Sequence, residues 1–316
     1  MGSLGRRVTR GLLTYGMVVV LVVLVIVAQS VYPQFLTPQN IQNLLTQNAS
    51  TAIVAIGATY VIICGGFDLS VSGSFGLGSV TFALLAMNGT SVPLALASAV
   101  LAGASCGLAN GLVIAKLRVN TFITTLGSST AFVGIAAITS GSSPITVSVP
   151  GFETLGNSSV FGVNLTVVIM GALYVVAEFV LRKTVFGRAI YAVGGNRETA
   201  RLAGIRVDLT QTSTFIISGV LAAFAGCVLA STLSTGQFDQ GGPVALDAIV
   251  AVVVGGTSLY GGEGAIWRTA IGVLMLATMN NLFSSLSVEQ PTQNIVKGVV
   301  IVAAVALDAL GRRQER

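Results

Sequence analysis

Long apolar runs, separated by short polar or glycine-rich breaks, make up most of the sequence. Most runs are about 17 to 25 residues long, the length that an α-helix needs to cross the hydrocarbon core of a bilayer. We therefore predict an all-α membrane protein with about ten transmembrane helices, some of them short or broken. Their approximate ranges are 12–31, 45–64, 71–87, 93–115, 121–139, 163–181, 211–235, 245–258, 267–286 and 294–310.

Two of the predicted spans, 71–87 and 245–258, are short for a full crossing, and a glycine pair lies close to each. Paired short or interrupted spans often line the pathway of a transporter. We expect Asp68 to cap the helix that follows it, with a second interpretation in which it shapes the cytoplasmic end of a pathway. The candidate helix-break and pathway residues are Gly65, Gly66, Asp68, Ser70, Gly255 and Gly256.

Composition supports a membrane protein, because 53% of the 316 residues are hydrophobic and only 9% are charged. The net charge of +5 comes from basic residues scattered singly, which does not indicate nucleic-acid binding. With no histidine, and three cysteines far apart at Cys64, Cys106 and Cys227, the chain offers no metal site and no common hydrolytic site. We expect membrane lipid as a partner and no enzymatic activity.

Lysine and arginine in short loops resist translocation, so they indicate the cytoplasmic side. Ten spans with both termini cytoplasmic place every basic residue inside except Lys297, which is expected outside at a helix end. We predict a multi-pass protein of the bacterial inner membrane. The first apolar run is long for a signal peptide and is predicted to stay uncleaved.

The sequence contains no Gly-Lys pair of the kind that cradles phosphates, so ATP and Mg²⁺ would have to bind to a partner subunit. The acidic residues fall near predicted span ends or in loops, whereas ion-coupled carriers usually bury them at mid-depth. Asp247 is the nearest exception, and we interpret it as a helix-start residue facing the positive end of the helix dipole. A stand-alone carrier or channel for a small polar solute remains the alternative.

Residues 61–74 and 252–264 resemble each other, with Gly65-Gly66 aligned to Gly255-Gly256. The match is consistent with an internal repeat with halves around 45–140 and 211–310, or with chance recurrence of glycine pairs. Gly103, Gly107 and Gly111 are spaced four apart, which predicts a small-residue face for close helix packing.

The loop at 182–210 contains six basic residues. Its middle predicts a short helix from about Asn196 to Ala203, capped by Asn196 and stopped by Gly204. Ala200 and Ala203 would share one face, and Arg197 and Arg201 would form a basic edge. This helix is either an interfacial segment that binds lipid headgroups or a rigid element that docks on a soluble partner.

The segment 187–205 resembles the cytoplasmic coupling loop of ABC-importer permeases, since Glu198-Thr199-Ala200 followed by Gly204 is similar to their Glu-Ala-Ala-x-x-x-Gly motif. Residues 65–73, 110–127 and 252–265 look like stretches typical of the ribose, arabinose, galactose and xylose permease family, which is related to autoinducer-2 permeases. Phe67, Ser72 and Thr199 depart mildly from the family pattern. The resemblance implies that the following residues contact an ATPase: Gly187, Arg188, Asn196, Arg197, Glu198, Ala200 and Gly204.

The resemblance further implies one transmembrane permease domain over residues 1–316, with a fold like that of type II importers. It implies a dimer with a second copy or a paralogue, a cytoplasmic ABC ATPase, and a periplasmic or lipid-anchored sugar-binding protein. The expected function is import of a pentose or hexose by alternating access, with polyols and autoinducer-2 as other substrates.

Overall fold

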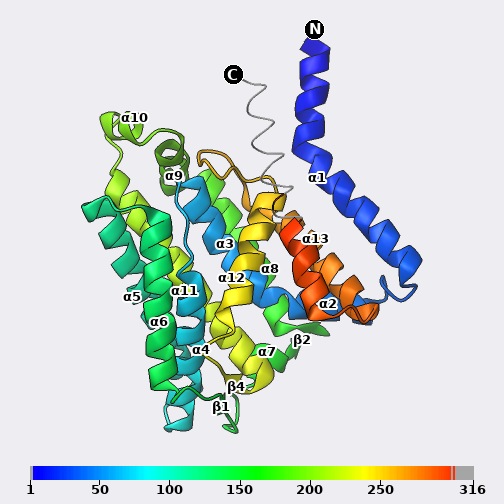
Figure 1. The fold of residues 1–316 in the computed structure, drawn as a ribbon, viewed down its shortest axis with the longest axis vertical. Helices are drawn as coiled ribbons and strands as arrows, with labels where there is room; N and C mark the ends of the chain where they lie inside the picture. Colours follow the sequence, from blue (N-terminus) through cyan, green and yellow to red (C-terminus); the bar gives the residue numbers. More distant parts are fainter. Residues whose placement is uncertain (1–2, 300–301, 303–316) are drawn as a thin grey trace.

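Helices form most of the computed structural model, which describes residues 3–299 and 302 (Figure 1). Residues 290–299 are helical as well. The helices are α1 (Ser3–Val31), α2 (Pro38–Gln47), α3 (Ala49–Ile63), α4 (Val71–Met87), α5 (Val92–Leu117), α6 (Thr121–Thr139), α7 (Thr154–Asn157), α8 (Leu165–Lys183), α9 (Val185–Gly195), α10 (Arg197–Leu202), α11 (Val207–Leu233), α12 (Gly241–Val254) and α13 (Ile266–Ser285).

Four two-residue strands lie in the connections: β1 (Ile145–Thr146), β2 (Ser159–Val160), β3 (Val163–Asn164) and β4 (Thr235–Gly236). β1 pairs antiparallel with β4, with Ile145 opposite Gly236. β2 pairs antiparallel with β3, with Ser159 opposite Asn164. β1, α7 and β2 lie within the connection 140–162 between α6 and α8, whereas β4 follows α11.

The predicted helical character of the apolar runs is confirmed over the described residues. By length and composition, α5, α6, α8 and α11 are long and apolar enough to cross a membrane, and the α2–α3 pair, bent by 51°, could form a fifth span. Helices α4 and α12 and the apolar part of α1 are shorter, so about ten crossings remain a prediction. The predicted span at 294–310 lies largely outside the described residues.

Helix α11 lies at the centre of the bundle and packs against α3, α4 and α5 (Figure 1). The predicted glycine face of α5 is the surface that meets it: a Cβ at Gly111 would lie 2.7 Å from the Cα of Thr212, and Cβ atoms at Gly103 and Gly107 would overlap the α11 backbone. Lipid tails are as apolar as leucine, so close backbone approach of this kind, not hydrophobic burial, holds such helices together.

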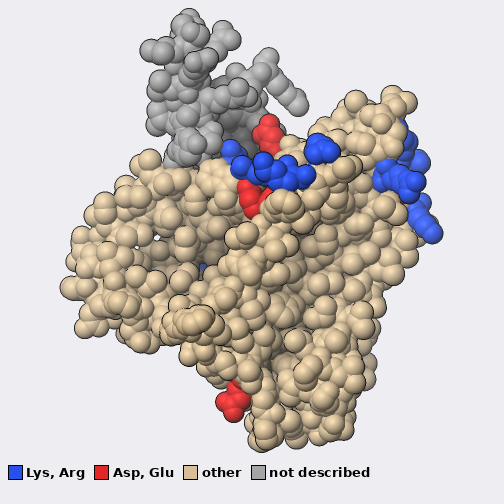
Figure 2. All heavy atoms as spheres, turned by 180° about the vertical axis from the view of Figure 1, so that it is seen from behind, with Lys and Arg blue, Asp and Glu red and all other residues tan. Residues whose placement is uncertain are grey.

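Helices α9 and α10 and the start of α11 lie at one end of the bundle, which we call the basic end (Figure 1). On the face drawn in Figure 2, the Lys and Arg side chains gather toward this end. Glu178 in the last part of α8 pairs there with Arg182 and accepts a hydrogen bond from the Trp267 N–H at 3.2 Å.

The prediction that Asp247 is a helix-start residue is wrong. Asp247 is the seventh residue of α12 and not a helix-start residue, because α12 already begins at Gly241. Its carboxylate pairs with the Lys297 ammonium group at 2.9 Å, with only 19% and 13% of the two side chains exposed. Lys297 lies in the helical segment 290–299, where the Asp247 carboxylate compensates its charge, and its place on the outer side of the membrane stays a prediction.

Candidate functional site

Helix α9 begins against the end of α8 in a turn that only glycine permits. The Thr184 hydroxyl caps α9 by accepting from the Gly187 N–H at 3.1 Å. A Cβ at Gly187 would overlap the backbone carbonyls of Val180 and Leu181. The turn is therefore tight, and it leaves Arg188 exposed beside it.

Helix α10 has the capping that the sequence predicts at both ends. The Asn196 side chain accepts from the Thr199 N–H at 2.9 Å. Gly204 takes the left-handed conformation with a φ of 83°, its N–H donates to the Arg201 carbonyl at 3.0 Å, and the Ile205 N–H donates to the Ala200 carbonyl at 3.0 Å. These bonds form a Schellman motif, which stops a helix sharply and directs the chain into α11.

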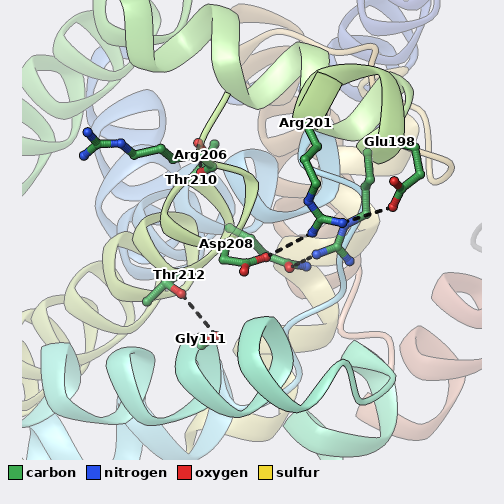
Figure 3. Close-up of polar contacts among 9 residues, drawn as sticks. Gly111, Glu198, Arg201, Arg206, Asp208, Thr210 and Thr212 are labelled. Atoms are coloured by element: carbon green, nitrogen blue, oxygen red, sulfur yellow. Dashed lines mark hydrogen bonds and ion pairs between the residues drawn. The ribbon is translucent and has the colours of Figure 1, made fainter. Parts of the chain in front are cut away.

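Side chains of α10 tie this helix to α11. Arg197 donates to the Gln211 side-chain oxygen at 2.6 Å. Arg201 lies 3.2 Å from the Glu198 carboxylate and 3.7 Å from that of Asp208 (Figure 3). The predicted basic edge thus faces α11, where acceptors hold it, so α10 and α11 are linked as one body.

The outward surface of α10 carries an apolar residue that the sequence pattern does not indicate. Ala200 is buried under the helix, whereas Ala203, predicted on the same face, is exposed because it is already the C-cap. Leu202 is 89% exposed. An isolated leucine among polar residues gives little signal in the sequence, and its exposure depends on how α10 lies on α11.

The segment between α3 and α4 is extended, and hydroxyl groups of α6 satisfy its backbone. The Phe67 N–H donates to the Thr121 hydroxyl at 3.2 Å, and the Leu69 N–H donates to the Thr125 hydroxyl at 3.1 Å. Unwound backbone within a membrane protein needs such internal partners. These threonines lie more than fifty positions away in the chain, so no local pattern could identify them.

The prediction that Asp68 caps the next helix is wrong, because α4 begins at Val71 with Ser70 in the N-cap position. The buried Asp68 carboxylate accepts from the N–H and the hydroxyl of Ser70, at 3.0 and 2.5 Å. The Asn110 amide of α5 donates to the same Ser70 hydroxyl at 2.7 Å. Asp68 therefore stabilises the extended segment before α4. A role of Asp68 in a pathway stays a prediction.

The two glycine pairs end their helices in the same way. Gly65 and Gly256 both have positive φ, of 83° and 79°, and each follows the C-cap of its helix in a Schellman motif. The equivalent positions are therefore offset by one residue from the alignment of Gly65 with Gly255. An internal repeat stays a prediction, supported by this shared geometry.

The basic loop 182–210 contacts the ends of both broken runs. The Gly262 N–H donates to the Ile63 carbonyl at 2.8 Å. A Cβ at Gly194 of α9 would overlap that same carbonyl, and a Cβ at Gly261 would lie 2.8 Å from the Cα of Gly65. Three glycine-containing backbones thus meet at van der Waals distance, which the sequence could not indicate because they come from three distant segments.

These features define a class: a multi-pass helical membrane protein with interrupted helices and a short, capped helix exposed at one end. A family model described as "Branched-chain amino acid transport system / permease component" matches residues 40–305. No solved structure matches the chain significantly.

Three relatives show how far the similarity extends. The chain is 40% identical over 290 residues to the ribose import permease protein RbsC of Bacillus subtilis, covering 91% of this chain and 90% of the relative. It is 38% identical over 294 residues to RbsC of Escherichia coli K12, covering 92% of each. It is 36% identical over 301 residues to the L-arabinose ABC transporter permease protein AraH of Azospirillum brasilense, covering 95% and 89%.

The chain therefore belongs to the family of ABC-importer permeases, whose members are membrane-embedded transport subunits and not enzymes. This membership decides between the two functions considered from the sequence, in favour of the importer subunit and against a stand-alone carrier.

Proposed function

We propose that this permease imports a monosaccharide, a pentose or hexose, which a periplasmic or lipid-anchored binding protein delivers. The support is the similarity to permeases named for ribose and L-arabinose, which extends over at least nine tenths of this chain. Selection of the sugar is left to the binding protein, so the permease needs a pathway that is wide enough and weakly polar.

A cytoplasmic ABC ATPase docks on α10 in this proposal, and it alone binds ATP and Mg²⁺. The observation that carries the docking site is the exposed Leu202, held outward on a helix whose other side is tied to α11 by Arg197 and Arg201. A rigid helix with an apolar tip fits a groove on a soluble protein, whereas a flexible loop would absorb motion instead of transmitting it.

The contacts of the basic loop suggest how closure of the ATPase reaches the membrane. Movement of α10 would move α11, which lies at the centre of the bundle. Movement of α9 would act through Gly194 on the end of α3 and on Gly262, in the connection that follows α12. Packed helices shift as bodies about such breaks, as alternating access requires.

We further propose ten membrane crossings, with the basic end and both termini in the cytoplasm. Successive crossings would be α1, the α2–α3 pair, α4, α5, α6, α8, α11, α12, α13 and the helix that includes residues 290–299. The gathering of basic residues at one end agrees with the positive-inside rule (Figure 2).

Helix α6 is the proposed contact with a second copy or a paralogue, and the sugar pathway would run beside it. Most of α6 is uncovered, because its only buried residues within the described part of this chain are Thr125 and Ala136. Gly127 and Gly134 lie seven positions apart on its open side, with no atom within 4 Å of a Cβ built on either. Small residues on an uncovered face allow another helix to approach closely.

The docking proposal is tested by Leu202→Asp, with co-purification of the cognate ATPase and its stimulation as readouts. We expect loss of co-purification and of sugar uptake, because a carboxylate would have to be desolvated in an apolar groove. The matched control is Phe161→Asp, which changes a fully exposed apolar residue between β2 and β3. The control should keep the ATPase, and normal uptake by Leu202→Asp would contradict the proposal.

A further inference from the structure

A groove with a cavity volume of about 580 Å³ lies between the ends of α5 and α11, beside α10. Its floor is apolar and includes Leu108, Leu112 and Ile216, and the two leucines are 42% and 38% exposed. Both flanking helices are candidate membrane spans. The floor therefore faces toward the depth that lipid chains occupy and not toward bulk water.

Three basic side chains line the outer end of this groove: Lys116 at the end of α5, Arg206 at the start of α11, and Arg201 of α10. The groove also contains one acidic residue, Asp208, which is paired with Arg201 (Figure 3). The side chains of Lys116 and Arg206 make no hydrogen bond or ion pair with any residue that the structure describes. The rim thus holds two uncompensated positive charges.

The spacing of charge and apolar surface matches an amphipathic ligand. Lys116 lies eight residues from Leu108 on the same helix, which corresponds to about 12 Å along the axis. A phosphate at the rim would leave its acyl chains lying along the apolar floor. A soluble anion would use the rim alone, and a soluble protein partner would not reach surface at membrane depth.

We propose that this groove binds an anionic phospholipid of the leaflet nearest the basic end, with the headgroup phosphate at Lys116 and Arg206 and an acyl chain on Leu108 and Leu112. Basic pockets between transmembrane helices recognise anionic headgroups in this way. The lipid site itself does not depend on the proposed orientation of the permease. Only the identification of this leaflet as the cytoplasmic one rests on it.

The position of the groove gives the lipid a consequence for coupling. Arg201 belongs both to the rim and to the contacts that hold α10 on α11. A bound phosphate would add a further anionic partner for this guanidinium group and would hold α10 more firmly. Anionic lipid would therefore favour the rigid form of the docking helix.

Native mass spectrometry of the purified permease tests the site, after equal amounts of dioleoyl phosphatidylglycerol and dioleoyl phosphatidylcholine are added to the detergent. The wild type should retain phosphatidylglycerol in preference to phosphatidylcholine. Each of Lys116→Gln and Arg206→Gln should lower this retention about fivefold, and the double variant roughly 25-fold. Leu108→Trp should lower it as well, because the indole fills the floor while the charges stay.

Arg118→Gln is the matched control, since Arg118 is exposed and lies two residues from Lys116 but does not line the groove. It should retain phosphatidylglycerol within about twofold of the wild type. Elution volume and melting temperature identify misfolded variants, and the single Arg206→Gln variant keeps the test decisive if the double variant is unstable.

Three results would overturn the lipid site. Equal retention of both lipids by the wild type would show no headgroup recognition, and unchanged retention by Leu108→Trp would show an anion held by surface charge alone. If the wild type appears as a dimer in these spectra and the groove variants appear only as monomers, the groove is an interface between two copies of the chain. The readout needs no ATPase, so failure of the proposed docking site would leave the result unaffected.

Discussion

At the scale of single residues, end signals in the sequence predict local structure when nothing distant competes. Asn196 and Gly204 bound α10 as expected, because a side-chain acceptor and a left-handed glycine act within one helical turn. Asp68 has the same kind of signal, yet α4 begins three residues later. Hydroxyls of α6 hold the backbone before α4 extended, and this tertiary contact overrides the local preference.

Gly204→Ala should loosen the end of α10. Gly204 has a φ of 83°, and this left-handed conformation raises the free energy of a residue with a Cβ by about 1–2 kcal/mol. Gly204→Asn should raise it less, because asparagine tolerates this conformation better. Hydrogen exchange of the Gly204 and Ile205 amides should accelerate, and ATPase stimulation should fall.

Gly195→Ala is the control, since a Cβ there also meets open space while its φ lies outside the positive range that side chains avoid. Equal effects of the two substitutions would mean that the left-handed turn does not matter for docking.

At the scale of elements, the glycine spacing on α5 predicts a packing face but not its partner. The structure identifies the partner as α11, whose backbone lies where Cβ atoms at Gly103 and Gly107 would be. Near the C-terminal end of α5 the Thr212 hydroxyl donates to the Gly111 carbonyl at 3.2 Å (Figure 3), and Leu112 and Thr212 line the groove there. Close packing and groove are thus neighbouring parts of one helix pair.

Gly107→Ala should destabilise the permease in detergent by about 1–3 kcal/mol, because the added methyl group overlaps the Phe215 carbonyl and forces α5 away from α11. Gly171→Ala on α8, where no atom lies within 4 Å of an added Cβ, should be neutral or stabilising by up to about 1 kcal/mol. The unfolding free energy of each purified variant is the measurement. Similar losses for both would contradict the packing argument.

At the scale of the whole molecule, the basic loop, the helix breaks and the central helix form one connected unit. α10 is tied to α11 through Arg197 and Arg201, and Gly194 of α9 contacts the end of α3 and Gly262 in the connection after α12. This arrangement suits a subunit that receives motion at one end and changes the packing of its spans. Under the proposed function, that end faces the cytoplasm, where the ATPase partner would hydrolyse ATP.

The proposed orientation predicts which surface positions react with a membrane-impermeant maleimide in intact cells. Ser143→Cys and Ser285→Cys should be labelled from outside, whereas Ala203→Cys should react only after permeabilisation. All three positions are exposed, and the native cysteines are free but buried, so background labelling should be low. Labelling of Ala203→Cys in intact cells would contradict a cytoplasmic basic end.

The sequence by itself determined that the protein is embedded in a bilayer, which segments are helical, and where α10 begins and ends. These depend on composition and on interactions within a few residues, which are visible along the chain. The helix at 71–87 and that at 121–139 have the bounds predicted for them.

Only the tertiary structure decided how the segments meet. It brought Gly194 to the carbonyl of Ile63 and Lys297 to Asp247, and it placed Lys116 and Arg206 in the lining of one groove. In each case the residues lie tens of positions apart or more in the chain, and whether they come together depends on the packing of whole helices. For the same reason the exposure of Leu202, which carries the proposed docking site, could be recognised only after α10 had been placed on α11.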